Sequence, residues 1–277
     1  MSEKYYEPLE HLEHPENNLN ISMNIELTEL KDREWNKFEG QRKSLAELGA
    51  KETFGKLVGF EQAFAAGPEH GAVLCMDEGC TGEGCHLAGS GCGIPEGQLL
   101  SELKAAGITE FTTHEGCGAW SLAHPELTNT ADKESAAIAW GEEIAKKLNL
   151  PHRHIPAPEM KRPPELHNAF YAIYDATGSF NRDRVPEMGP GFVTSPKYFS
   201  SAKADLELAV KIALGGHGFG KKFDQENPFV LVGVYDPSNT SLSREQILAD
   251  LQEVQNKFPA DYVKIDLIDA PMPERVQ

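Results

Sequence analysis

The chain of 277 residues is 40% hydrophobic and 8% aromatic, which suits one large packed domain or two modest ones and excludes disorder throughout. A formal net charge of -17 at pH 7 argues against nucleic acid and anionic membrane as partners, because both attract a basic surface. No apolar run is long enough to span a membrane and no secretory signal opens the chain, so we expect a cytoplasmic protein whose partner is a small molecule or a second copy of the chain.

The first segment, residues 1–31, is polar and acidic and predicts an N-terminal arm. From Asp32 the pattern becomes helical, and we expect one or two helices before the first strand. The apolar residues that recur there at roughly helical spacing are Trp35, Phe38, Leu45, Leu48, Phe54, Leu57, Val58 and Phe60.

A strand, a loop, a helix and a second strand follow in that order. Residues 72–76 form an apolar run typical of a buried strand, and residues 77–94 are rich in glycine and cysteine, which predicts an irregular loop. Residues 95–106 predict a helix that Gly107 terminates, and residues 108–113 predict a strand. This order indicates a right-handed βαβ unit with parallel strands, whose carboxyl ends carry the ligand-binding side chains.

The remaining sequence continues the alternation of helices and strands. The expected elements are a helix at 132–148, strands at 151–155 and 170–175, a helix at 201–214, a strand at 229–235, a helix at 241–258 and a strand at 262–268. The predicted fold class is therefore α/β, with a mainly parallel sheet flanked by helices. We divide the chain into an arm (1–31), an α/β domain (32–181) and a C-terminal α/β extension (182–277), and we predict no internal repeat.

Three potential metal ligands stand at or just after the first two strand ends. Cys75 lies on the first strand, and the second strand leads into His114 and then Cys117. Since neighbouring parallel strands end at the same edge of a sheet, we expect these side chains to converge. Two thiolates and one imidazole make a zinc site that leaves a fourth position open. Zinc deprotonates a bound water near neutral pH, and the hydroxide attacks an electrophilic carbon.

Three further polar residues near these strand ends are the predicted catalytic residues. Asp77 could accept a hydrogen bond from the zinc-bound hydroxide, or it could occupy the fourth zinc position and close the site. Glu78 could equally serve as the base. His86 could pass protons, because an imidazole titrates near neutrality.

Four segments carry a resemblance to a known family. They are Cys75-Met76-Asp77, residues 86–90 (HLAGS), residues 107–119 (GITEFTTHEGCGA) and residues 170–178 (FYAIYDATG). Together they resemble the β-class carbonic anhydrases, over about residues 35–180. The resemblance implies that Cys75, His114 and Cys117 bind Zn²⁺ and that Asp77 is the catalytic carboxylate. It further implies a parallel sheet, a helical N-terminal arm, a last core strand at 170–175 and a dimer whose two subunits build the cleft.

The sequence departs from the family pattern beside the aspartate. Where the family has Ser-Arg after the aspartate, this chain has Glu78-Gly79, so the arginine that pairs with the aspartate is missing from the motif. Asp77 would then be free to ligate zinc. His86 and Ser90 also replace the arginine and the last asparagine of the family's second segment.

Two functions stay open. The first is a zinc enzyme that interconverts carbon dioxide and bicarbonate, or that hydrolyses a related linear molecule such as carbonyl sulfide or carbon disulfide. The second is a non-catalytic zinc-binding or redox-sensing module in which Asp77 closes the metal shell. The sensing thiols would be Cys80, Cys85 and Cys92, which could otherwise be free thiols, a reversible disulfide or ligands of a second metal or of an iron–sulfur cluster.

Overall fold

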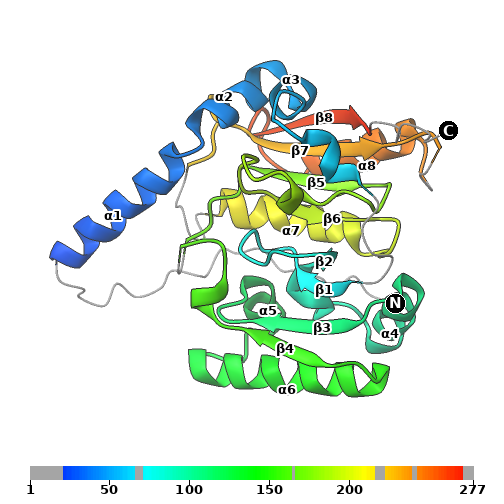
Figure 1. Cartoon of the computed structure of the whole chain (residues 1–277). Helices are drawn as coiled ribbons and strands as arrows, with labels where there is room; N and C mark the ends of the chain where they lie inside the picture. Colours follow the sequence, from blue (N-terminus) through cyan, green and yellow to red (C-terminus); the bar gives the residue numbers. More distant parts are fainter. Residues whose placement is uncertain (1–20, 66–70, 164–165, 216–221, 239–241, 271–277) are drawn as a thin grey trace.

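Two four-stranded sheets, in which every pairing is parallel, form the centre of the molecule. The computed structural model describes residues 21–65, 71–163, 166–215, 222–238 and 242–270, with side chains from residue 29 onward. The strand orders are β2-β1-β3-β4 and β6-β5-β7-β8. Helices flank both sheets, so the predicted α/β class is confirmed (Figure 1).

The bounds of the strands are β1 (Ala72–Cys75), β2 (Gly84–Leu87), β3 (Glu110–His114), β4 (His152–Ile155), β5 (Tyr171–Asp175), β6 (Phe192–Thr194), β7 (Phe229–Tyr235) and β8 (Val263–Asp269). The bounds of the helices are α1 (Ile21–Asn36), α2 (Glu39–Leu48), α3 (Ala50–Phe54), α4 (Glu96–Ala106), α5 (Gly118–Ala123), α6 (Thr130–Leu148), α7 (Ala202–Leu214) and α8 (Arg244–Gln255). Short 3₁₀ helices lie at Phe60–Phe64, Ala88–Gly91, Ala157–Glu159 and Arg182–Arg184.

The N-terminal helices begin earlier than the sequence pattern indicates. Helix α1 starts at Ile21, and Figure 1 shows it extending away from the sheets, whereas α2 and α3 lie against β7 and β8. Leu45 and Phe54 are buried as expected. Leu48 and Val58 are 59% and 82% exposed, so these two residues of the apolar pattern do not pack in the core. Residues 1–20 of the predicted arm lie outside the described residues.

The predicted βαβ unit is present, but its loop contains more regular structure than expected. β1, α4 and β3 lie where the sequence places them, and α4 ends at Gly107 in the left-handed conformation. Residues 77–94 include the edge strand β2 and a 3₁₀ helix, so the prediction of a wholly irregular loop is wrong. Of the four residues of β2 only Leu87 is fully buried, which explains why no apolar pattern marks this strand.

The C-terminal elements largely follow the prediction. Helix α8 begins with a capping box in which the Ser243 hydroxyl accepts from the Gln246 N–H and the Ser243 N–H donates to the Gln246 side chain. Ser241, the expected start, lies outside the described residues. The strand expected at 170–175 exists as β5, but it is an internal strand of the second sheet rather than the last strand of the first.

The two sheets repeat one topology. In each, the first strand along the chain is internal, the second lies beside it at one edge of the sheet, and the third and fourth follow on the other side of the first. We call β1 to β4 with their helices the first half and β5 to β8 with theirs the second half. The edge strands β2 and β6 contact each other, and Figure 1 shows the strands in one row from β8 to β4. One continuous core joins the halves, with Leu74 and Trp120 from the first and Tyr171 and Phe229 from the second.

Among the described helices, none combines the length and the apolar character needed to cross a lipid bilayer.

Candidate metal centre

The first half brings two potential ligands together at its strand ends. β1 and β3 are neighbours in parallel register, with Val73 opposite Phe111, so Cys75 and His114 emerge at the same edge of the sheet. Both side chains are buried.

A turn after β3 supplies the third ligand. Gly116 adopts a φ of +68°, a left-handed conformation that glycine accommodates without strain, and this turns the chain into α5. Cys117 is the residue that caps this helix, and its sulfur accepts a hydrogen bond of 3.4 Å from the Trp120 backbone N–H. This contact fixes the position of the Cys117 sulfur at the start of α5.

The predicted ligands converge as the sequence indicates. Donor atoms of Cys75, His114 and Cys117, which we call the metal set, all lie within 4.8 Å of one another. Nδ1 of His114 lies 2.9 Å from the Glu115 carbonyl oxygen and donates to it, which leaves Nε2 as the ring nitrogen available to a metal ion. Burial would lower the pKa of His114, but the negative charge of Cys75 raises it to about 9, so a bound cation would have to displace a proton from Nε2. Nε2 is buried without a hydrogen-bond partner, as expected of a nitrogen arranged to bind a metal.

The chemistry of the metal set fits a divalent cation. A hydrogen bond with Cys117 and burial both raise the pKa of the Cys75 thiol well above its usual value. Two buried sulfurs therefore resist losing both protons unless a cation offsets their charge. Two sulfurs and one nitrogen are a donor set that suits zinc in particular.

Asp77 lies outside the metal set and has an arginine partner. Nε and Nη2 of Arg162 donate to its two carboxylate oxygens at 2.7 Å and 3.0 Å, and the Gly79 N–H donates to Oδ1 at 2.8 Å. Both side chains are nearly inaccessible, with exposures of 6% and 5%. The expectation that Asp77 lacks an arginine is therefore wrong: the arginine comes from the connection between the halves, 85 residues further along the chain.

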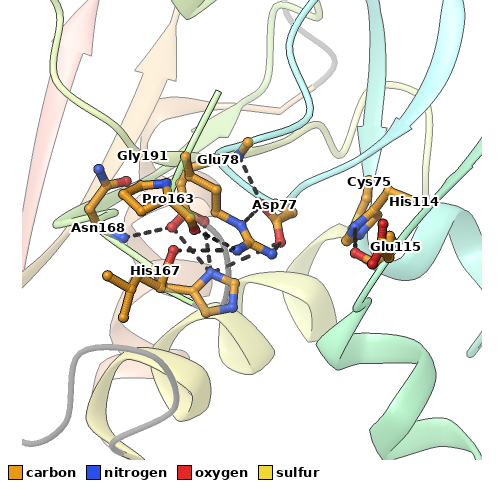
Figure 2. A network of polar contacts seen from close by, with 12 residues as sticks. Cys75, Asp77, Glu78, His114, Glu115, Pro163, His167, Asn168 and Gly191 are labelled. Carbon is orange, nitrogen blue, oxygen red and sulfur yellow. Dashed lines mark hydrogen bonds and ion pairs between the residues drawn. The ribbon is translucent and has the colours of Figure 1, made fainter. Parts of the chain in front are cut away.

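The charges around Asp77 keep it ionised. Burial favours the protonated form, but the positive charges of His167 and Arg162 outweigh it and hold the pKa of Asp77 well below its usual value. Figure 2 shows Asp77 between the Cys75 and His114 side chains on one side and Glu78 and His167 on the other.

Glu78 belongs to this polar network and is completely buried. His167 Nδ1 lies 3.0 Å and 3.1 Å from its carboxylate oxygens, and the Asn168 N–H donates to it at 2.7 Å (Figure 2). Burial would lower the pKa of His167, yet the charge of Glu78 raises it. Asp77, Glu78 and His167 also lie close enough to hold a cation, but Arg162 already occupies both oxygens of Asp77. We therefore regard these residues as an ion-pair network.

His86 and Asp77 line one small chamber of about 10 Å³, which is room for a single water molecule. Nδ1 of His86 lies 3.1 Å from the Cys75 carbonyl oxygen and donates to it, so Nε2 is left as an acceptor. Burial lowers the pKa of His86. The structure thus brings two of the predicted catalytic residues, Asp77 and His86, to one chamber and ties the third, Glu78, into the network behind them.

The other three cysteines are free thiols and belong to no metal-capable group among the described residues. Burial raises the pKa of each, to about 11 for Cys85 and well above the usual thiol value for Cys92 and Cys80. At neutral pH they hold little of the reactive thiolate form.

Sequence reasoning missed the residues that orient Asp77. Arg162 and His167 lie in a polar, proline-rich stretch with no apolar period, and nothing in their spacing links them to Asp77. The clue was the incomplete motif itself: an aspartate beside a metal site without its expected arginine needs another cation.

Comparison with known proteins adds no assignment. No protein-family model, no curated protein and no solved structure matches this chain.

Proposed function

We propose that this chain is a zinc enzyme that interconverts carbon dioxide and bicarbonate, as its resemblance to the β-class carbonic anhydrases implies. The observation that carries the proposal is the pairing of Arg162 with Asp77 beside the metal set. This pairing restores, from a distant part of the chain, the arginine partner that the local motif lacks.

The metal set would hold the zinc ion with one position left open. Bound there, zinc lowers the pKa of a coordinated water molecule to near 7 and so supplies a nucleophile at neutral pH. The Glu115 carbonyl fixes the orientation of the His114 ring, and the Trp120 N–H stabilises the Cys117 sulfur.

Asp77 and His86 would handle the proton. Asp77 is held ionised, so its carboxylate accepts a hydrogen bond from the nucleophile and orients it toward the substrate carbon. Arg162 keeps that carboxylate turned away from the metal and is a positioning residue. His86 shares the chamber with Asp77, and its free Nε2 is suited to receive a proton and pass it to buffer.

The contacts of Asp77 favour the enzyme over the sensor. A closed metal shell would require Asp77 to leave two strong hydrogen bonds with Arg162. A redox sensor would require accessible thiolates, which the buried Cys80 and the half-buried Cys85 and Cys92 do not provide because their pKa values are raised. A reducing compartment such as the cytoplasm suits these free thiols.

Stopped-flow hydration of carbon dioxide by the zinc-loaded protein tests the proposal. We expect turnover above the buffer rate, an effect abolished in Cys117→Ser and strongly reduced in Asp77→Asn. Carbonyl sulfide and carbon disulfide should be assayed in parallel. Turnover of either sulfur compound without hydration of carbon dioxide would change the substrate and retain the mechanism, whereas buffer-level rates for all three would contradict the proposal.

A further inference from the structure

The second half has the topology of the first but not its ligands. Among the described residues, neither metal-capable group includes a residue beyond His167. Asp175, at the end of β5, accepts hydrogen bonds from the Thr177 N–H and hydroxyl at 2.9 Å and 2.6 Å, and Asp236, just after β7, accepts from the Ser238 N–H at 2.8 Å. The carboxylates at the strand ends of the second half thus stabilise the turns that follow the strands.

Equivalent elements of the two halves face each other. Edge strand β2 contacts edge strand β6, and the connection that follows β1 contacts the connection that follows β5. At Gly82 the contact is reciprocal: the Asn181 side chain donates to the Gly82 carbonyl at 3.2 Å, and the Gly82 N–H donates to Asp183 at 2.8 Å. Contact between like elements is the relation that a two-fold axis imposes on the subunits of a homodimer.

The second half also supplies much of the wall around Asp77. The chamber that Asp77 and His86 line is closed on its other side by Phe180, Asn181, Arg182 and Val193. All four come from the β5–β6 connection or from β6 itself.

Arg182 is the strongest link across this wall. Its side chain is 10% exposed. Nη2 donates to the carbonyl oxygen of Glu78 at 3.0 Å, and Nη1 donates to the carbonyl oxygen of Gly191 at 2.9 Å. Arg182 therefore ties the backbone beside Asp77 to the second half, while Arg162 holds the Asp77 side chain.

We propose that the second half completes the candidate site in the way that a partner subunit would, so that one chain carries one whole site and Arg182 positions the turn that bears Asp77. The inference rests on the proposed function, because it assigns the wall of that same site. The family resemblance implies a cleft built by two subunits. Under this inference, the two halves of a single chain build it.

Full-length protein loaded with cobalt(II) in place of zinc provides the test. Thiocyanate, a linear anion of three heavy atoms, is titrated against the visible absorption of the cobalt ion. Arg182→Gln should raise the apparent Kd of thiocyanate about 10-fold, the lower end of what loss of an outer-shell partner costs, with cobalt stoichiometry unchanged. Arg182→Lys keeps the charge but cannot bridge both carbonyl oxygens, so we expect an intermediate Kd.

Arg184→Gln is the matched control. Arg184 lies on the same 3₁₀ helix and also bridges the halves, with Nε donating to Glu83 at 2.9 Å, but it does not line the chamber. Its variant should bind thiocyanate as the original chain does. Equal affinities in the Arg182 and Arg184 variants would overturn the inference.

A dilution series of the unaltered chain gives a readout that needs no variant. Sedimentation velocity measures the state of association while thiocyanate affinity is measured at the same concentrations. We expect the affinity for thiocyanate per chain to be the same in monomers and in any larger species. A thiocyanate affinity that decreases on dilution, together with the fraction of dimer, would overturn the inference. A chain that binds no cobalt would contradict the proposed function as well, whereas a normal cobalt and thiocyanate response that ignores Arg182 would contradict only this inference.

Discussion

The two halves share one strand order and differ in what stands at their strand ends. In the first half, Cys75 and His114 emerge side by side and Cys117 follows on the next turn. In the second half, the corresponding strand ends carry Asp175 and Asp236, whose oxygens accept hydrogen bonds from their own turns. A parallel sheet therefore supplies a place for a site, and a few side chains decide whether a metal can bind there.

Removing one ligand should have the largest effect, because it makes the first half resemble the second. Cys117→Ser should lower zinc affinity by at least about 100-fold, the upper end of the cost of losing an outer-shell partner. Metal analysis after dialysis against a weak chelator measures the loss. Cys85→Ser changes a thiol outside the metal set and should keep one zinc per chain. Equal zinc content in the two variants would contradict the claim that the ligands at the strand ends of the first half bind the metal.

The buried pair of Asp77 and Arg162 is the next most sensitive feature. Arg162→Gln leaves a buried carboxylate without its partner and should lower the free energy of unfolding by about 3–5 kcal/mol at pH 7, measured by urea denaturation. Asp77→Asn combined with Arg162→Gln should recover part of this loss.

The difference in the free energy of unfolding between Arg162→Gln and the original chain should become smaller as the pH falls. The folded chain holds the pKa of Asp77 below its unfolded value of 3.8, so the contribution of the pair is present above pH 3.8 and is lost as the pH falls through the folded-state pKa. A loss of unfolding free energy in Arg162→Gln that stays constant from neutral to acidic pH would contradict this role for Arg162.

Asp205 in the second half should show the opposite pH dependence. This buried carboxyl has no cationic partner among the described hydrogen bonds, and burial raises its pKa to about 7. The folded chain holds its proton more tightly than the unfolded chain does. The resulting stability is complete below pH 3.8 and is lost as the pH rises through about 7.

Asp205→Asn tests that difference between the two buried carboxyl groups. The variant should be more stable than the original chain at pH 8 by roughly 2–4 kcal/mol, since each unit of pKa shift corresponds to about 1.4 kcal/mol. The two proteins should converge near pH 4. Thermal unfolding at both pH values measures the effect, and a variant that is less stable at pH 8 would show that Asp205 is stabilised in its charged form.

The smallest effect concerns the turn at Asp175. Thr177→Ala removes a buried hydroxyl that donates to Asp175 and should cost about 1–2 kcal/mol without changing zinc content. Thr109→Ala, at an exposed position, should cost less than about 0.5 kcal/mol in the same urea titration. Loss of zinc in Thr177→Ala would mean that the second half contributes to the metal centre itself.

The sequence predicted those parts of the site that depend on local pattern. β1 and β3 read as apolar runs, and the rule that parallel strands end at one edge placed Cys75, His114 and Cys117 together. Arg162 escaped prediction because its contact with Asp77 depends on how the connection between the halves folds back. β2 escaped because only Leu87 of its four residues is fully buried, and β6 escaped because its three residues, although buried, are too few to form a pattern.

The repeated topology left no trace in the sequence for a related reason. Strand order is set by which apolar faces pack and by the hand of the connections, and many different sequences satisfy both. The predicted boundary at residue 181 lies between β5 and β6, because the resemblance to a known family extended through β5.

X-ray absorption at the zinc edge of the full-length chain, loaded with one equivalent of zinc, reports the atoms that surround the ion. We expect two sulfur ligands, one nitrogen ligand and one further light atom, with the light atom retained in Asp77→Asn because Arg162 holds that carboxylate away from the metal set. A shell without sulfur, or one that loses its light atom when Asp77 is replaced, would contradict this expectation.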